Sequence, residues 1–162
     1  MGDGYFRKCP KCGFEFKEQT GAGFLYPIEY EQTIQKAKNG ELGKAIQTFL
    51  TEHEDGVLDA EYVTLCCEDC GNLSTGKDLT MYLPKNRKKE NVEHSSWSIA
   101  FGFEGAEYVT KRDFKRYFQE YAKYSHRCEQ CGGAMRIMGE GEEIMCPKCK
   151  LPLEITDVLM LD

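Results

Sequence analysis

Apolar side chains recur along this 162-residue chain at intervals of three to four residues in some segments and of two in others. The first spacing is typical of helices and the second of strands, so both kinds of element are predicted. Pro27 suits the first turn of a helix and Asn39-Gly40 suits its end. Helical spacing resumes over Leu42–Leu50. The pattern therefore predicts a two-helix segment at about residues 27–55.

Alternating apolar positions predict several short strands. Val63, Leu65 and Cys67 share one parity, which is the spacing of a strand with one buried face. Two short apolar stretches also flank Gly139 and Gly141, and this arrangement predicts a hairpin with a glycine-bearing turn. The predicted strands span residues 60–67, 79–83, 97–103, 135–138, 142–146 and 155–161.

The stretch 85–96 (K-N-R-K-K-E-N-V-E-H-S-S) is almost free of apolar side chains and predicts a linker or a long exposed loop. Beyond it, Thr110 followed by Asp113 is typical of the start of a helix. Aromatic residues then recur at helical spacing, so an amphipathic helix is expected over 111–127. Its aromatic face would consist of Phe114, Tyr117, Phe118 and Tyr121.

Nine cysteines change the picture, because eight of them form four Cys-x-x-Cys pairs. Two thiolates at this spacing can grip one metal ion when the backbone between them turns tightly, whereas a redox site would need only one pair. Glycine follows three of the pairs and allows the positive φ that the turn needs, while Lys150 follows the fourth. Cys66 would break the spacing with Cys70, so no ligand is expected there. The four pairs, called knuckles below, are Cys9/Cys12, Cys67/Cys70, Cys128/Cys131 and Cys146/Cys149.

The knuckles at Cys9–Gly13, Cys67–Gly71, Cys128–Gly132 and Cys146–Cys149 resemble those of the zinc-ribbon and rubredoxin-like families. The resemblance implies small sheet modules in which two knuckles share one metal. Residues 1–84 also resemble bacterial CpXC-type domains, which place a helical insertion between two cysteine pairs, although Cys67-Glu-Asp-Cys70 lacks the proline of that family. The CpXC resemblance implies metal binding and a fold but no settled function.

Four knuckles can pair in three ways, and loop closure does not decide between them because each doubling of loop length costs only about 0.6 kcal/mol. A predicted strand follows each even-numbered knuckle, which makes neighbouring knuckles look like complete modules. The expected ligands are Cys9, Cys12, Cys67 and Cys70 at one site, and Cys128, Cys131, Cys146 and Cys149 at the other.

The expected architecture is therefore α+β, with two small zinc-ribbon modules. Residues 1–84 would form the first module, which carries the two-helix insertion. Residues 85–96 would link it to the second module at 97–162, in which the amphipathic helix precedes the second ribbon.

Two Zn²⁺ ions are the expected cofactors, with iron as the alternative because rubredoxin iron uses the same four thiolates. Zinc is favoured because the intervals between the pairs are very unequal and because small modules need a metal staple. The formal net charge is −6. Each zinc on four thiolates contributes +2 − 4 = −2, so two sites would bring the charge to about −10.

Catalytic chemistry is not expected, because cysteine fills every coordination position and the sequence contains no His-Glu-x-x-His, Walker or nucleophile-elbow motif. No small-molecule substrate is evident either. The amino-terminal residues lack an apolar signal core, and no apolar stretch is long enough to cross a bilayer. These features favour a structural zinc protein that acts as a binding or scaffolding module in the bacterial cytoplasm, without membrane attachment.

A protein partner is favoured, because an acidic chain is poorly suited to neutralising phosphates. Nucleic acid is the alternative, because the segment 111–127 interleaves basic and aromatic side chains, which can track a backbone and stack on bases. A rubredoxin-like iron electron carrier is the third possibility. The candidate contact residues for a partner or nucleic acid are Lys111, Arg112, Lys115, Arg116 and Lys123.

Overall fold

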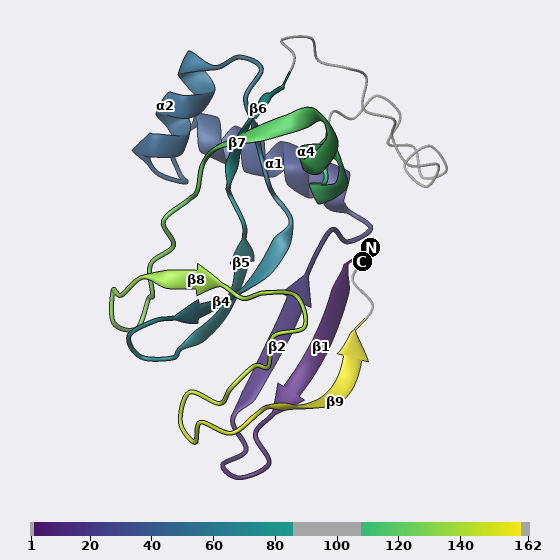
Figure 1. Cartoon of the computed structure of the whole chain (residues 1–162), viewed down its shortest axis with the longest axis vertical. Helices are drawn as coiled ribbons and strands as arrows, with labels where there is room; N and C mark the ends of the chain where they lie inside the picture. Colours follow the sequence, from purple (N-terminus) through teal and green to yellow (C-terminus); the bar gives the residue numbers. More distant parts are fainter. Residues whose placement is uncertain (1, 86–107, 160–162) are drawn as a thin grey trace. The chain divides into compact units, whose positions relative to one another are not determined.

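The computed structural model describes residues 2–85 and 108–159, which form short helices and strands of an α+β fold (Figure 1). The strands make three sheets of three strands each. The helices are α1 (Tyr26–Lys38), α2 (Lys44–Glu52) and α4 (Lys111–Tyr117). The strands are β1 (Asp3–Lys8), β2 (Glu15–Thr20), β3 (Val57–Leu58), β4 (Tyr62–Cys67), β5 (Leu73–Lys77), β6 (Met81–Pro84), β7 (Phe118–Ala122), β8 (Met135–Ile137) and β9 (Glu154–Leu159).

The chain divides into two compact units, and neither is continuous in sequence. This division differs from the expected modules 1–84 and 97–162, because segments from both ends of the chain contribute to one unit. The predicted strand 97–103, and all but the first residue of the predicted linker, lie outside the described residues. Unit 1 consists of Met1–Phe24, Tyr62–Asp78 and Ser125–Asp162, and unit 2 of Leu25–Glu61 and Leu79–Tyr124.

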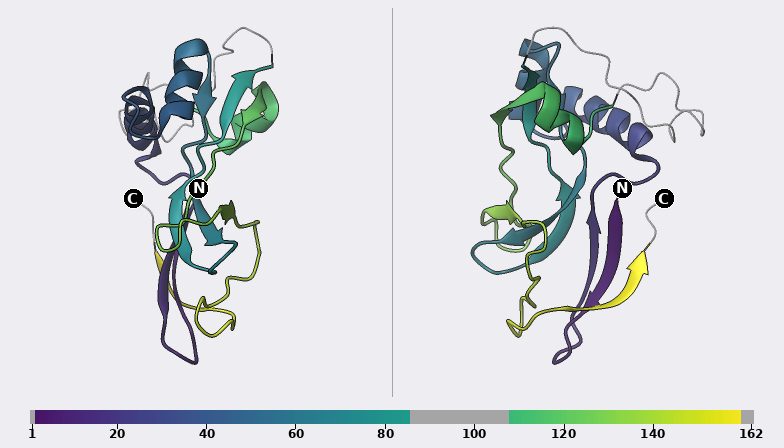
Figure 2. Two further views of the ribbon diagram at one scale, coloured as in Figure 1. Left: turned by 90° about the vertical axis from the view of Figure 1, so that its left-hand side faces the viewer. Right: turned by 45° about the vertical axis from the view of Figure 1, so that its right-hand side comes forward.

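Unit 1 contains two sheets built on one plan, in which the first strand of a hairpin also pairs with a strand from much later in the chain. In the first sheet β1 lies between β2 and β9, and in the second β4 lies between β5 and β8 (Figures 1 and 2). All four pairings are antiparallel. Each sheet is therefore completed only when a distant segment of chain returns to it.

The predicted hairpin of residues 135–138 with 142–146 does not form. Instead β8 pairs with β4, with Met135 opposite Cys67. The segment 142–146 contributes an isolated bridge between Met145 and Pro152. The six-residue strand β4, which is mostly buried, offers β8 a row of backbone partners, and this pairing outweighs the local turn.

Unit 2 is built around the two predicted helices and the small sheet of β3, β6 and β7. Ile46 and Phe49 are three residues apart in α2, so both face the same side of the helix and both are buried. The hydroxyl group of Tyr26, at the start of α1, donates a hydrogen bond of 2.7 Å to the carbonyl oxygen of Val109. The core cluster consists of Ala37, Ile46, Phe49, Leu58, Leu79 and Met81.

The predicted helix over 111–127 is wrong beyond Tyr117. Its start is as expected, with the Thr110 backbone N–H donating to Asp113 at 3.0 Å. From Phe118 onward the chain forms β7, which pairs with β6. Aromatic side chains suit strands, and β6 supplies the backbone partners that would otherwise come from the next helical turn. The expected aromatic face is consequently divided, and Tyr121 is 52% exposed.

None of the helices within residues 2–85 and 108–159 is long and apolar enough to cross a membrane.

Truncating Ile46 tests the core of unit 2. Ile46 is fully buried, so Ile46→Ala removes packed atoms and should lower the free energy of unfolding by about 2–5 kcal/mol. Ile28→Ala is the matched control, because Ile28 lies in α1 of the same unit and is 41% exposed. The control should change stability by less than about 0.5 kcal/mol. Denaturant unfolding followed by circular dichroism measures both, and equal losses would contradict this core.

Candidate metal centres

All four knuckles have the same backbone turn. In the second knuckle, the N–H of Gly71 donates to the carbonyl oxygen of Cys67 at 3.0 Å, and the N–H of Cys67 donates to Asn72 at 2.9 Å. The equivalent pair of bonds recurs in each of the other three. The residue after the second cysteine has a positive φ throughout, which is 72–73° at Gly13, Gly71 and Gly132 and 58° at Lys150. The lysine therefore adopts the conformation that glycine favours.

The eight predicted ligands come together in two groups of four, but not in the expected pairs. The first and fourth knuckles share one group, called site A: Cys9, Cys12, Cys146 and Cys149. The second and third share the other, called site B: Cys67, Cys70, Cys128 and Cys131. The expectation that neighbouring knuckles pair is therefore wrong.

Sheet pairing explains the correction. The carboxyl-terminal strand β9 lies against β1, with Glu154 opposite Lys8, and this brings the fourth knuckle to the first. In the same way β8 lies against β4, which brings the third knuckle to the second. The first knuckle of each site lies in the turn of a hairpin, β1–β2 or β4–β5. A complete ribbon thus needs a hairpin around one knuckle and a third strand after the other.

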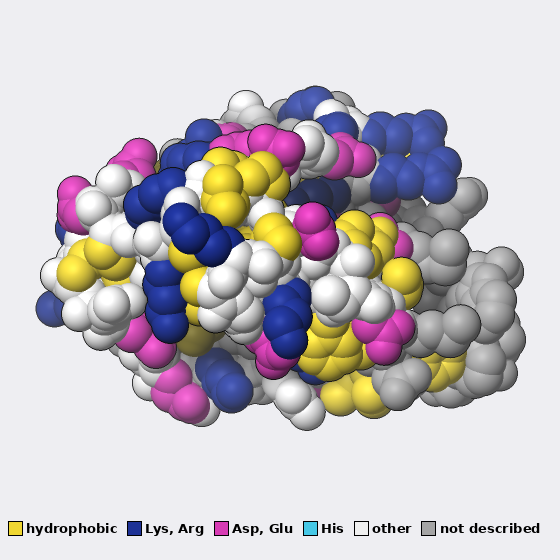
Figure 3. All heavy atoms as spheres, turned by 90° about the horizontal axis from the view of Figure 1, so that it is seen from below, with side chains coloured by type: hydrophobic (Ala, Val, Ile, Leu, Met, Phe, Trp, Pro, Cys, Tyr) yellow, Lys and Arg dark blue, Asp and Glu magenta, His cyan; other side chains and the backbone are white. Residues whose placement is uncertain are grey.

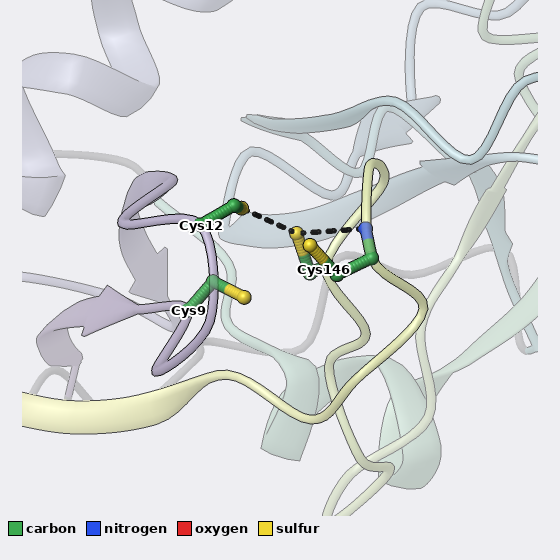
Figure 4. A group of neighbouring side chains, drawn as sticks. Cys9, Cys12 and Cys146 are labelled. Carbon is green, nitrogen blue, oxygen red and sulfur yellow. Dashed lines mark hydrogen bonds between the residues drawn. The ribbon is translucent and has the colours of Figure 1, made fainter.

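The spacing of the sulfur atoms fits a tetrahedral metal ion. The Sγ atoms of Cys12 and Cys146 are 3.6 Å apart in site A (Figure 4). In site B the Sγ–Sγ distances are 3.5 Å for Cys67 and Cys131 and 3.8 Å for Cys70 and Cys128. Metal–sulfur bonds of about 2.3 Å in a tetrahedron place sulfurs about 3.8 Å apart, whereas a disulfide requires about 2.05 Å. Both groups can therefore hold a metal ion without further closure.

Backbone N–H groups prepare the first cysteine of a knuckle to lose its proton. The N–H of Cys12 is the main donor to Cys9 and lowers the pKa of its thiol from 9.0 to about 7, against the opposing effect of burial. The N–H of Cys131 acts in the same way on Cys128 and lowers the pKa to about 6. The neighbouring thiol of Cys12 raises the pKa of Cys149 to about 12. A metal must displace the remaining protons, so metal affinity should fall as the pH is lowered.

Other groups support the ligands, and the sequence did not single them out. The side-chain amide of Asn72 lies 3.7 Å from the sulfur of Cys128 and can donate to it. The N–H of Gly133 donates to the sulfur of Cys131 at 3.4 Å. A Cβ atom at Gly133 would lie 2.1 Å from a carboxylate oxygen of Asp69, so a side chain at this position would require the exposed Asp69 side chain to move. The second glycine of the Cys131-Gly-Gly sequence is the signal that marks this close approach.

The remaining candidate residues lie outside both groups. Cys66 is half-buried and belongs to neither, as expected from its spacing. His126 is also outside and its Nε2 lies 2.9 Å from the carbonyl oxygen of Asp78. The basic candidates lie in unit 2, four of them on α4 and one after β7, and all are exposed. They are Lys111, Arg112, Lys115, Arg116 and Lys123.

Removing one exposed ligand from each site tests the pairing. Cys12→Ser disables site A, so Cys9, Cys146 and Cys149 should become reactive toward iodoacetamide before the ligands of site B do. The matched variant Cys131→Ser, also at an exposed ligand, should release the ligands of site B before those of site A. Peptide mapping by mass spectrometry identifies each modified cysteine. Labelling of Cys67 and Cys70 before Cys146 and Cys149 in Cys12→Ser would instead show that neighbouring knuckles pair.

Comparison of the chain with known proteins found no matching family model, no matching curated protein and no matching solved structure. The resemblance to zinc ribbons therefore rests on the knuckles and their two sheets, and the resemblance to CpXC-type domains stays a sequence-based prediction. Function has to be inferred from the chain's own residues.

Proposed function

We propose that this chain is a structural zinc protein, in which two filled metal sites stabilise a binding or scaffolding module of the bacterial cytoplasm. The observation that carries the proposal is the composition of the two sites. Each has four cysteine ligands whose sulfurs lie within 4.8 Å of one another, so a bound ion gains four protein bonds and keeps no open position. Structural zinc sites are closed in this way, whereas catalytic zinc retains an exchangeable ligand.

The small size of the sheets supports zinc as the metal in both sites, because small domains need additional stabilisation. The two sheets of unit 1 contain strands of only three to six residues, and small scaffolds of this kind rarely gain enough stability from apolar burial alone. Structural zinc supplies about 10–16 kcal/mol of apparent binding energy in finger peptides. Iron would fit the same four sulfurs, so the choice of metal rests on this structural role and on the unequal spacing of the knuckles.

A protein is the partner that the surface of unit 1 fits best. Strand β9 lies at the edge of its sheet, and its side chains are exposed or half-buried along the whole strand. Ile155 and Val158 are 51% and 65% exposed, so this edge combines backbone hydrogen-bonding groups with apolar side chains. An extended segment of another protein can add to such an edge. The net charge of −6 also opposes association with polyanions.

Nucleic acid is the second candidate, and the surface of α4 favours it. Arg112, Lys115 and Arg116 are exposed on this short helix, and the guanidinium group of Arg116 lies 5.1 Å from the ring centre of Tyr117. The ammonium group of Lys85 donates to the carbonyl oxygen of Lys115 at 2.9 Å, which brings a further cation to the helix. On the face in Figure 3, basic and acidic side chains are both present.

Metal analysis tests the main proposal. The purified chain should contain two zinc ions by native mass spectrometry, and a preparation with iron would absorb visible light. Cobalt substitution should give the spectrum of two tetrahedral four-thiolate sites, because each group found among residues 2–85 and 108–159 consists of four cysteine sulfurs. Chelation should unfold unit 1, with loss of its sheet signal in circular dichroism. One metal or none per chain, or a cobalt spectrum with an oxygen ligand, would contradict the proposal.

Charge reversal on α4 tests whether nucleic acid, and not a protein, is the partner. If α4 binds nucleic acid, Lys115→Glu with Arg116→Glu should weaken binding of single-stranded oligonucleotides by tenfold or more at low salt, because two phosphate contacts are lost (on the order of 1 kcal/mol each). Lys36→Glu with Lys38→Glu is the control, because it changes the net charge equally on α1 of the same unit. Fluorescence anisotropy measures the affinity. Equal losses in both variants, or no binding by the unaltered chain, would remove this candidate.

A further inference from the structure

The fourth knuckle places a lysine in a backbone conformation that costs stability, and the position of its ammonium group offers a reason. Lys150 has a φ of 58°, whereas the other three knuckles use glycine at the same place. The left-handed conformation brings the Cβ atom of an L-residue close to its own backbone, so glycine would be more stable in the turn. The side chain of Lys150 must therefore contribute something that glycine cannot.

The side chain of Lys150 extends from site A to the knuckle of site B. A Cβ atom built on Gly71 would lie 2.9 Å from Nζ of Lys150, and 3.9 Å from Cα of Pro147 in the same fourth knuckle. Gly71 is the turn residue of the second knuckle, directly after the ligand Cys70. The fourth knuckle consequently lies against the second. Because the fourth belongs to site A and the second to site B, this contact connects the two sites within unit 1.

The contact continues into a shared core. Leu73, in β5 of the site B sheet, is buried in the same cluster as the site A ligands Cys9 and Cys146. Cys66, on β4 next to the ligand Cys67, packs against the same cluster, as does Cys149. Displacement of a ligand in one site therefore disturbs packing beside the other.

The positive charge of Lys150 can offset the negative charges of the two filled metal sites. A metal ion on four thiolates leaves each site with a net charge of −2, so two adjacent filled sites repel one another. An ammonium group that extends from the site A knuckle to the Gly71 turn of site B reduces that repulsion. The N–H of Lys150 donates to the carbonyl oxygen of Cys146 at 2.9 Å, so the site A knuckle sets where this exposed side chain begins.

We infer that the two metal sites are coupled through the contact between Lys150 and the Gly71 turn, so that loss of metal from either site speeds loss from the other. Coupling of this kind is reciprocal, because each site stabilises the same junction. The inference rests on the proposed function, since it requires both sites to hold metal.

Removing the positive charge of Lys150 tests whether this charge slows the release of zinc from site B. In the zinc-loaded full chain at low salt, Lys150→Gln should speed release of zinc from site B to a chelator by about two- to fivefold, the range for an exposed charge contact, and Lys150→Arg should restore the original rate. High salt should reduce the difference. Lys148→Gln is the control, because it removes the same charge from an exposed position of the same knuckle, where the ammonium group lies 5.8 Å from the Phe14 ring centre. Alkylation after timed chelation, with peptide mapping, follows each site separately.

A pair of glycine variants tests the contact itself. Gly71→Ala and Gly132→Ala introduce the same backbone strain into site B, because φ is 73° and 72°. A Cβ atom at Gly71 would displace the Lys150 ammonium group, whereas one at Gly132 would meet no atom within 4 Å. Both variants should weaken site B and so speed release from site A, but Gly71→Ala should speed site A release at least about twofold more than Gly132→Ala does, because it also displaces the contact.

The outcomes separate the two proposals. A chain that binds fewer than two metals contradicts the proposed function and this inference together. Two bound metals, with equal site B release in Lys150→Gln and Lys148→Gln and equal site A release in Gly71→Ala and Gly132→Ala, overturn the coupling alone.

Discussion

Four sulfurs at tetrahedral spacing, supplied by two turns from distant parts of the chain, are the constraint on which unit 1 depends. The sheets have strands of only three to six residues, and the candidate ligands also form part of the core, since Cys9 and Cys146 are buried among Phe16, Ile144 and Leu153. Metal coordination by these sulfurs would therefore close the chain and order part of its core at once. A protein of this kind should lose packing, and not merely a bound ion, when its metal is removed.

Nested pairing of the knuckles sets the organisation of the whole chain. Site A joins the first and last knuckles, and site B joins the two knuckles between them. Both segments of unit 2, Leu25–Glu61 and Leu79–Tyr124, leave unit 1 and return to it. The ends of each inserted segment are thus fixed by strands and knuckles of unit 1. This connectivity suits a scaffold whose inserted unit carries surface features of its own, such as the basic side chains of α4.

Local chemistry made the knuckles, the glycine turns and the two helices of residues 27–55 predictable, because each depends on neighbours in sequence. Pairing was not predictable from the same reasoning, since it depends on which distant strands meet, and the end of α4 was missed for the same reason when β6 provided partners for Phe118. One overlooked signal agrees with the observed pairing. The first and fourth knuckles share the sequence Cys-Pro-Lys-Cys, and the second and third both have glutamate after the first cysteine.

The most direct test of the account is nuclear magnetic resonance of the chain loaded with cadmium-113, in which each metal signal correlates with the β protons of its own cysteine ligands. The account predicts two signals in the range of four-thiolate cadmium. One should correlate with Cys9, Cys12, Cys146 and Cys149, and the other with Cys67, Cys70, Cys128 and Cys131. A signal that connects the first knuckle to the second, or a single bound cadmium, would contradict it.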